Sequence, residues 1–387
     1  MTRNEESNPL ASVMETLAEH GLDGMGDAIR ILLNEAMKIE RSQALGAGPY
    51  QRSEERKGHA NGFKPKTVAT RLGKLTFDVP QTRGIEFYPQ SLERGVRSER
   101  ALKLAIAEMY VQGVSTRKVT AVMQELCGLE VSSSDVSRAA RLLDEELAAW
   151  RNRPLGCFPY LILDARYEKV RHGGSVVSVA LLIAVGIGPD GKRSVLGVSV
   201  SLSEAEVHWR EFLAHLQDRG LHGVMLITSD DHAGLKAARE ARFAGVPWQR
   251  CQFHLIQNAL QHVPKLAMRA EVALDLKNIL NAPDRADAQR QLQGIVAKYA
   301  QSAPKLSSWI ESNLPESLTV FALPAPHRRK LRTSNLLERI NKEIKRRTRV
   351  ATLFPNTDSL LRLASAVLAE IDEEWQTGKI YLNMERS

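Results

Sequence analysis

The segment YLILDARYEKV, residues 160–170, opens the part of the chain in which the hydrophobic pattern changes from helical to strand-like. Two apolar runs follow it, SVVSVALLIAVGIG at 175–188 and SVLGVSVSL at 194–202. The tripeptides His-Gly-Gly at 172–174 and Pro-Asp-Gly at 189–191 separate the three runs and have the composition of tight turns. This pattern predicts three consecutive antiparallel strands.

Beyond residue 202 the pattern alternates between helix and strand. A helix is expected at 204–219 and a buried strand at 224–228, followed by a helix at 233–242 and a short strand near 248–253. Three antiparallel strands followed by alternating α and β elements predict a mixed sheet with helices on its faces, which is an α/β fold.

Three acidic residues lie within or directly after these predicted strands. Asp164 follows three apolar residues, and a carboxylate buried there is costly unless the strand end is exposed or a cation compensates the charge. Asp230 and Asp231 follow the strand at 224–228, at the end where open sheets bind ligands. Because Asp often terminates strands, each position alone is weak evidence, and spacing does not distinguish Asp230 from Asp231.

The segment TSNLLERINKEIKRRTRV, residues 333–350, is predicted to form an amphipathic helix with Thr333 or Ser334 as its N-cap. Residues 328–349 contain ten Lys or Arg against two Glu, so their net charge of +8 equals that of the whole chain. A helix of this charge is expected to bind a polyanion, most commonly a phosphate backbone. The cations predicted to contact DNA here are Arg339, Lys342, Lys345, Arg346, Arg347 and Arg349.

Glu338 is an acid within this cationic helix. It could hold a divalent metal between itself and a phosphate, together with the carboxylates on the strands. The alternative is a surface helix in which Glu338 pairs with Lys342 four residues later, a contact worth a few tenths of a kcal/mol.

Composition indicates a globular protein with 43% hydrophobic and 25% charged residues, and 387 residues suffice for two or three domains. No apolar run approaches the roughly 20 residues that span a bilayer, and the N-terminal residues are polar, so we expect a cytoplasmic, nucleoid-associated protein with no membrane partner. Three scattered cysteines argue against a disulfide framework.

The N-terminal region is predicted to be mainly helical and to bind DNA. Helices are expected at 9–45, an extended or flexible basic segment at 46–65 and a small β-hairpin or sheet at 67–88. Three helical patterns between 98 and 151 are compatible with a helix-turn-helix that exposes Arg117, Lys118 and Arg138, although similar helical hairpins occur in proteins that do not bind DNA. The predicted domains are 1–95 (helical and basic, with the β element), 96–152 (helix-turn-helix-like), 153–254 (first part of the catalytic core), 255–325 (all-helical insertion) and 326–387 (second part of the core).

Several motifs resemble one known family, the mutator-type insertion-sequence transposases, and the resemblance extends nearly from end to end. The segments that carry it are ERKGHANGFKPKTVATRLGKL (55–75), EMYVQGVSTRKV (108–119), PYLILDARYEKVR (159–171), SDDHAGLKAA (229–238), WQRCQFH (248–254) and SNLLERINKEIKRRTRVATLFPN (334–356). The family has a ribonuclease H-like catalytic domain with an Asp, Asp, Glu triad. Matched by position, Asp164, Asp230 and Glu338 are the three acids, whereas Asp231 stands where the family more often has a small residue.

The resemblance implies a DNA transposase that binds terminal inverted repeats. Two Mg²⁺ ions about 4 Å apart, with Mn²⁺ as a possible substitute, would be held by the triad and would support DNA cleavage and 3′-OH strand transfer by in-line phosphoryl transfer. Terminal inverted repeats and target DNA are the implied partners. Because two ends must be paired, we expect a homodimer or a larger oligomer.

The Cys251-x-x-His254 motif provides two potential zinc ligands, and no second pair lies nearby in the sequence, so a structural zinc site is not expected. The resemblance implies instead that Cys251 and His254 support the active site. The alternative is that Cys251 belongs to the core and His254 caps or orients a helix.

Two other functions remain compatible with the sequence. One is a metal-dependent DNA nuclease or resolvase of the same fold, which would cut DNA without joining a 3′-OH to a target. The other is a non-catalytic, sequence-specific DNA-binding protein in which the three acids are structural.

Overall fold

The computed structural model describes residues 8–92, 94–95, 97–348 and 353–384. The chain divides into two compact units, residues 1–142 and 143–387. The division lies before the predicted domain boundary at 152/153, because helix α6 (Asp144–Arg151) belongs to the second unit. At the end of α6, the Arg151 guanidinium donates to Ser365 Oγ of the C-terminal helix at 2.9 Å.

The first unit begins with two helices and a β-hairpin. Helices α1 (Pro9–His20) and α2 (Met25–Leu45) confirm the helical prediction for 9–45, and the hairpin consists of β1 (His59–Thr70) and β2 (Gly73–Arg83). Met37 of α2 and Phe77 of β2 are buried in their common core. The hairpin begins earlier than predicted because the first residues of β1 are exposed and polar, which leaves no burial pattern in the sequence.

Three short helices complete the first unit. They are α3 (Arg100–Val111), α4 (Thr116–Cys127) and α5 (Ser133–Ala140). The Ser115 side chain caps α4, and Ser132 forms a capping box with Asp135 at the start of α5. The last of the three helical patterns is expected to form one helix at about 135–150. The structure divides it into α5 and α6, with a 3₁₀ turn at 141–143 between them.

A five-stranded mixed sheet forms the centre of the second unit. Its strands are β3 (Tyr160–His172), β4 (Ser175–Ile187), β5 (Arg193–Ser201), β6 (Leu226–Ser229) and β7 (Trp248–Arg250). The spatial order is β5-β4-β3-β6-β7. The first three strands pair antiparallel, whereas β6 pairs parallel with β3 and with β7. The structure thus confirms the predicted mixed sheet.

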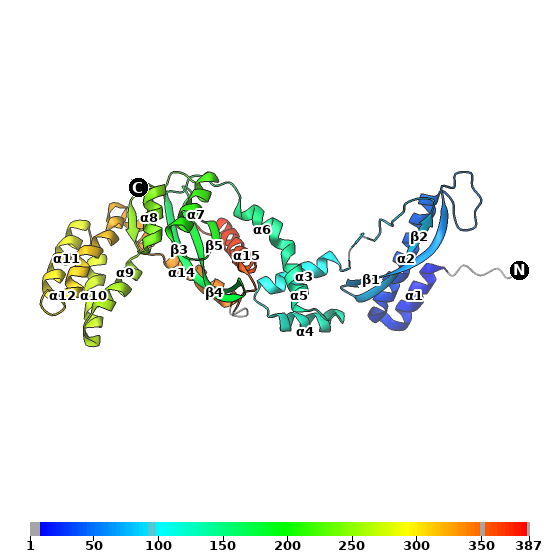
Figure 1. The fold of residues 1–387 in the computed structure, drawn as a ribbon, viewed down its shortest axis with the longest axis horizontal. Helices are drawn as coiled ribbons and strands as arrows, with labels where there is room; N and C mark the ends of the chain where they lie inside the picture. Colours follow the sequence, from blue (N-terminus) through cyan, green and yellow to red (C-terminus); the bar gives the residue numbers. More distant parts are fainter. Residues whose placement is uncertain (1–7, 93, 96, 349–352, 385–387) are drawn as a thin grey trace. The chain divides into compact units, whose positions relative to one another are not determined.

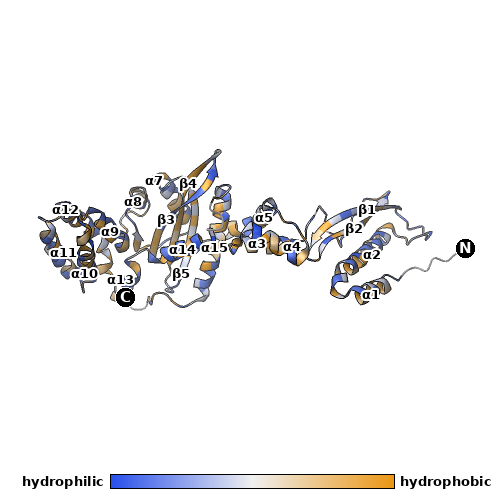
Figure 2. Cartoon of the chain, turned by 90° about the horizontal axis from the view of Figure 1, so that it is seen from below, coloured by the Kyte–Doolittle hydropathy of each residue, from blue (hydrophilic) through white to orange (hydrophobic). Residues whose placement is uncertain are grey.

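Helices cover both faces of the sheet (Figure 1). On one face, α7 (Glu206–Asp218) and α8 (Ala233–Arg242) pack on the apolar side of β3, where Leu161 and Leu163 are fully buried with Trp209. On the other face lie α14 (Asn335–Thr348) and α15 (Thr357–Thr377). Colouring by hydropathy shows the apolar strands enclosed between these helices (Figure 2). Because side chains alternate along a strand, Asp164 is directed to the α14 face.

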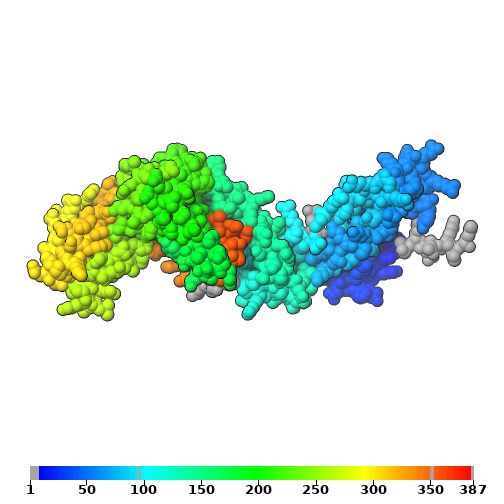
Figure 3. All heavy atoms as spheres, viewed as in Figure 1, coloured from blue at the N-terminus to red at the C-terminus, as the bar shows by residue number. Residues whose placement is uncertain are grey.

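A helical block separates β7 from α14 in the sequence. It comprises α9 (Gln252–Ala259), α10 (Arg269–Leu280), α11 (Arg285–Tyr299) and α12 (Pro304–Asn313), with short 3₁₀ turns at 260–262, 266–268, 314–317 and 319–322. These helices have a hydrophobic core of their own, and α13 (Ala325–Leu331) leads back to the sheet. In the space-filling view the block (yellow) is continuous with the residues of the sheet domain (green) (Figure 3). These helices lie in the range where the sequence predicts an all-helical insertion, 255–325.

No helix in the described part of the chain is both long enough and apolar enough to cross a membrane.

Asp372 of α15 joins the last helix to the sheet and to the segment that follows α6. Its buried carboxylate accepts from Ser194 Oγ and from the Val195 amide, each at 2.8 Å, and from the Arg153 guanidinium at 2.7 Å. Burial alone lowers the pKa of Arg153, and the Asp372 charge opposes this shift. Arg153 and Asp372 therefore hold each other in place by this ion pair.

We predict that Asp372→Ala lowers the free energy of unfolding of the second unit by about 3 kcal/mol, because Arg153 and two buried donors lose their acceptor. Urea denaturation of the full chain, followed by tryptophan fluorescence, measures this change. Glu373→Ala removes an exposed carboxylate from the same helix and is expected to change the value by less than about 0.5 kcal/mol. If the two substitutions lowered the free energy of unfolding equally, the Asp372 carboxylate would not have the structural role described here.

Candidate active site

The parallel pairing of β3 with β6 brings two acidic residues together. Ile162 lies opposite Thr228 in this ladder. Continuing the register by two residues places Asp164 opposite Asp230, and adjacent strands are separated by about 4.8 Å. Asp164 is only 6% exposed, and Asp230 is partly buried. Two carboxylates therefore lie side by side at the end of β6.

The proximity and burial of the two carboxylates change their acidity. Burial, and then repulsion from Asp230, raises the pKa of Asp164 to about 7. Burial likewise raises the pKa of Asp230, although His254 and His232 oppose this shift. Without a further positive charge, the pair is thus poorly compatible with full ionisation.

Helix α14 extends across these strand ends. The Asn341 side-chain amide donates to Asp164 Oδ2 at 2.9 Å, and the Asn341 backbone carbonyl accepts from the Arg166 guanidinium at 3.1 Å. Just before the helix, the Ser334 hydroxyl lies 3.4 Å from Cys251 Sγ. The apolar side chains of Leu337, Ile340 and Ile344 are buried, as expected for the predicted amphipathic helix.

Glu338 lies between Ser334, which contacts Cys251, and Asn341, which contacts Asp164 of β3. It is four residues after Ser334 and three before Asn341, so all three residues share one face of the helix. Its side chain is partly exposed, and no ion pair with Lys342 forms in the described structure. Among the described residues, no three Asp, Glu, His or Cys side chains lie close enough to enclose a metal ion. Glu338 is thus on the helix face that approaches the Asp pair, but its carboxylate is not in direct contact with the pair.

Cys251 and His254 lie beside the acidic pair, at the end of β7. Contact with the Cys251 sulfur raises the pKa of His254 to about 9, and the charges of Asp164 and Asp230 add to this shift despite the opposing effect of burial. Burial alone would raise the pKa of the Cys251 thiol, but contacts with His254 and Ser334 lower it overall. His254 is consequently a cation at neutral pH next to two carboxylates.

The structure distinguishes Asp230 from its neighbour Asp231. The Asp231 carboxylate forms a 2.9 Å ion pair with the buried Arg250 guanidinium. Asp230, in contrast, interacts electrostatically with Asp164 and His254. The geometry therefore makes Asp230, the residue selected by the family pattern, the partner of Asp164.

Two further residues near the site, Asn341 and Glu204, were not among those predicted from the sequence. Asn341 could have been found from its position one turn after Glu338 on the helix. Glu204 is a buried carboxylate whose Oε2 lies 3.9 Å from His232 Nδ1, and burial raises its pKa. Gly234 permits this arrangement, because a Cβ there would lie 2.2 Å from the Glu204 carbonyl oxygen.

The cations predicted to bind DNA occupy different environments. Arg339, Lys342, Lys345 and Arg346 are exposed on α14, and Arg346 also pairs with Glu343. Arg347 is only 8% exposed and pairs with Glu343 and Glu370, so we reassign it from the DNA surface to the packing of α14 on α15. Arg349 lies outside the described residues. In the first unit, Arg117 and Lys118 on α4 and Arg138 on α5 are exposed, and Arg138 pairs with Asp135.

Comparison with known proteins gives a consistent result along the whole chain. The model of the transposases of the Mutator family matches residues 1–378. The transposase for insertion sequence element IS406 of Burkholderia multivorans is 60% identical over 385 residues, which cover 99% of each chain. The transposase for ISRM5 of Rhizobium meliloti is 44% identical, covering 100% of this chain and 96% of the relative. That for IS256 in transposon Tn4001 of Staphylococcus aureus is 34% identical over 98% of each chain.

The raised pKa of Asp164 predicts a gain in stability when its charge is removed. Between pH 4 and 7 the folded protein keeps a proton on Asp164 that the unfolded chain releases, so this group lowers stability as the pH rises. We predict that Asp164→Asn stabilises the metal-free protein by up to about 4 kcal/mol at pH 8, and that the gain disappears near pH 4. Thermal denaturation in EDTA at both pH values measures it.

Asp218→Asn, at an exposed position on α7, serves as the control and should have little effect at either pH. If Asp164→Asn were no more stable than the wild type at pH 8, the carboxylate would not be held in the environment described here.

Proposed function

The chain belongs to the Mutator family of transposases, and from this premise we propose that it binds the terminal inverted repeats of an insertion sequence and catalyses metal-dependent DNA cleavage and strand transfer. Asp164, Asp230 and Glu338 are the proposed catalytic residues. The observation that supports this assignment best is the β3–β6 register, which sets the buried Asp164 and the partly buried Asp230 side by side beneath the helix that carries Glu338.

We also propose that the second unit has a ribonuclease H-like fold. Three features support this proposal: an antiparallel β3-β4-β5 meander, two parallel strands added beside β3, and helices on both faces. The helical block inserted between β7 and α14 agrees with the interrupted core expected from the sequence.

The residues fit divalent cations such as Mg²⁺ or Mn²⁺. Carboxylate oxygens are the ligands that these ions prefer, and a cation would offset the burial that raises the pKa of both Asp side chains and the repulsion from Asp230 that adds to the rise for Asp164. Within the described part of the chain, the buried Oδ1 atom of Asn341, next to Asp164, has no hydrogen-bond donor. When bound, two such ions would lower the pKa of a water and stabilise the leaving oxygen of a phosphodiester.

The protein's own groups would position the reactants. Asp164 and Asp230 would provide fixed oxygen ligands, since Asn341 orients Asp164 by a hydrogen bond. Glu338 would complete the set by a change of side-chain rotamer from a helix that is already anchored on both sides of it. A water would be the nucleophile in cleavage and the freed 3′-OH the nucleophile in strand transfer, so no covalent enzyme intermediate is required.

The cationic side of α14 would hold the DNA strand at this site. Arg339, Lys342 and Lys345 are exposed on the helix that carries Glu338. The first unit would recognise the inverted repeats through α4 and α5, which expose Arg117, Lys118 and Arg138. Pairing two element ends would require at least a dimer.

We predict that Asp164→Ala, Asp230→Ala and Glu338→Gln each reduce strand transfer by at least about 1,000-fold, while the affinity for inverted-repeat DNA stays within about threefold of the wild type. The test uses purified full-length protein, Mg²⁺ and a pre-cleaved end with a free 3′-OH. Asp218→Asn is the control and should retain activity.

Two results would contradict the proposal. A wild-type protein that cuts the ends but never joins them to target DNA would be a nuclease or resolvase. Triad variants that retain full function would indicate a DNA-binding protein in which the acids are structural.

We predict that Arg339→Gln weakens binding to DNA of any sequence and reduces the slope of log K against log salt by about 0.9, which corresponds to the loss of one phosphate contact. A fluorescence-anisotropy titration over 50–300 mM salt measures the slope. Arg210→Gln, at an exposed position on α7, should leave it unchanged. An unchanged slope for Arg339→Gln would exclude this residue from the DNA interface.

A further inference from the structure

Arg250, the last residue of β7, is an almost completely buried cation shared by several acceptors. Its guanidinium is 2% exposed and contacts the Asp231 carboxylate at 2.9 Å. The same Nη1 atom donates to Asn313 Oδ1 at 2.9 Å and lies 3.3 Å from the Glu316 carboxylate. Arg250 therefore connects the end of β6 to the last part of the helical insertion.

Both neighbours of Asp230 in the sequence are held by residues of β7. On one side, the Trp248 indole donates to Ser229 Oγ at 3.0 Å, and that hydroxyl donates to the Asp230 carbonyl at 2.8 Å. On the other side, Arg250 binds Asp231. The backbone of Asp230 is thus fixed from both directions.

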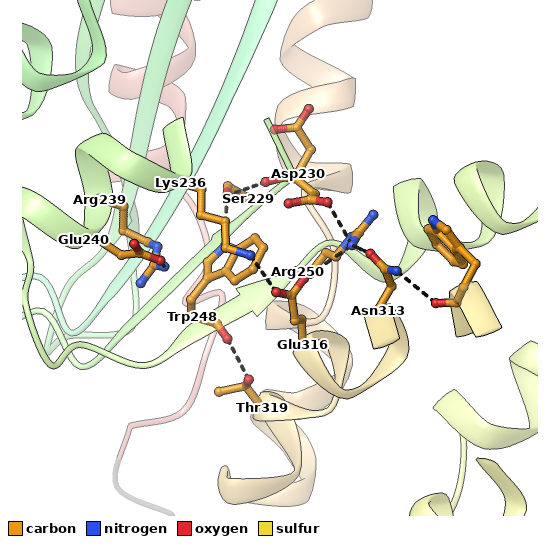
Figure 4. Close-up of polar contacts among 12 residues, drawn as sticks. Ser229, Asp230, Lys236, Arg239, Glu240, Trp248, Arg250, Asn313, Glu316 and Thr319 are labelled. Carbon is orange, nitrogen blue, oxygen red and sulfur yellow. Dashed lines mark hydrogen bonds and ion pairs between the residues drawn. The ribbon is translucent and has the colours of Figure 1, made fainter. Parts of the chain in front are cut away.

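The helical insertion makes further contacts with α8 and with β7. Lys236 of α8 forms a 2.6 Å ion pair with Glu316, and the Trp248 carbonyl accepts from the Thr319 hydroxyl at 2.6 Å. Figure 4 shows Lys236 and Arg250 approaching Glu316, with Trp248 next to Ser229. A continuous series of contacts thus connects the helical insertion to the end of β6.

We propose that the Arg250–Asp231 ion pair is a positioning element for catalysis: it fixes the direction of the Asp230 carboxylate and makes that direction depend on the helical insertion. This inference rests on the proposed function, in which Asp230 is a metal ligand. Groups that orient a metal ligand commonly change metal affinity or activity by 10–100-fold when they are removed. Asp231 is not one of the three proposed catalytic acids, but it would affect catalysis by orienting its neighbour Asp230.

Stability alone explains such a pair poorly. A buried ion pair contributes little net stability compared with apolar residues of similar size, because both charges must leave water. Here Arg250 shares Glu316 with Lys236, and its buried Nε atom has no hydrogen-bond partner among the described residues. Asp231 thus supplies the nearer carboxylate to this cation, at 2.9 Å compared with 3.3 Å for Glu316, and it does so next to Asp230.

The test compares Asp231→Ala with a matched control in the same unit. Asp144 forms a similar pair with Arg362, which is also buried, and lies on α6 away from the three acids. Each full-length variant is examined by four measurements: Mn²⁺ binding by calorimetry, the kcat of strand transfer, the Kd for inverted-repeat DNA, and the Tm. Asp231→Asn, which keeps an oxygen acceptor for Arg250, is the conservative variant.

We expect Asp231→Ala to weaken Mn²⁺ binding about tenfold and to lower kcat by a similar factor at limiting metal, with the Kd for DNA unchanged. Raised Mn²⁺ should restore much of kcat, and Asp231→Asn should fall between Asp231→Ala and the wild type. Asp144→Ala should lose at least as much Tm as Asp231→Ala, since Arg362 loses its carboxylate partner, but should keep wild-type metal binding and kcat.

The inference is overturned if Asp231→Ala loses Tm as the control does while metal binding and kcat stay at wild-type values. In that case the ion pair is structural, and the proposed function stands because the wild type still joins DNA. A wild-type protein that neither binds Mn²⁺ nor transfers strands overturns the proposed function and the inference together.

Discussion

The parallel pairing of β3 with β6 is the constraint on which the rest of the site depends. It forces Asp164 and Asp230 to lie side by side in a largely buried position, where two negative charges are unfavourable. The surrounding groups respond to this unfavourable pair: Asn341 donates to Asp164, and His254 becomes cationic beside both carboxylates. The apolar cores of the sheet and of the insertion lie apart from this charge, so the fold can tolerate a destabilised pair of acids.

Three sides of helix α14 have different properties. Its apolar stripe packs against the unit, its exposed side presents cations, and Glu338 lies on a third side between the contacts to Cys251 and Asp164. The helical insertion separates α14 from β7 in the sequence. Two hydrogen bonds nevertheless hold the chain against the sheet domain just before α14 begins. The Thr228 hydroxyl donates to the Leu331 carbonyl at 2.8 Å, and the Gln252 amide donates to the Arg332 carbonyl at 3.0 Å. These contacts set where α14 begins.

Patterns of hydrophobicity predicted the elements well, because burial on one or both faces determines which residues can form them. The mixed sheet and the helices between β7 and α14 could be predicted for this reason. The exposed start of β1 and the break between α5 and α6 could not, since neither leaves a periodic signal. At the site, sequence suggested the three acids but could not show that Asp231 binds Arg250 or that Arg347 is buried, because both facts depend on partners far away in the chain.

The central claim is that Asp164, Asp230 and Glu338 share bound divalent cations. Replacing these ions by Fe²⁺ in the full-length protein bound to end DNA, and generating hydroxyl radicals in place, cuts the polypeptide next to each ligand. Mass spectrometry of the fragments should find cuts close to residues 164, 230 and 338, which disappear when excess Mg²⁺ is added. Cuts at the first two positions without any near 338, or cuts only elsewhere, would contradict a shared three-carboxylate site.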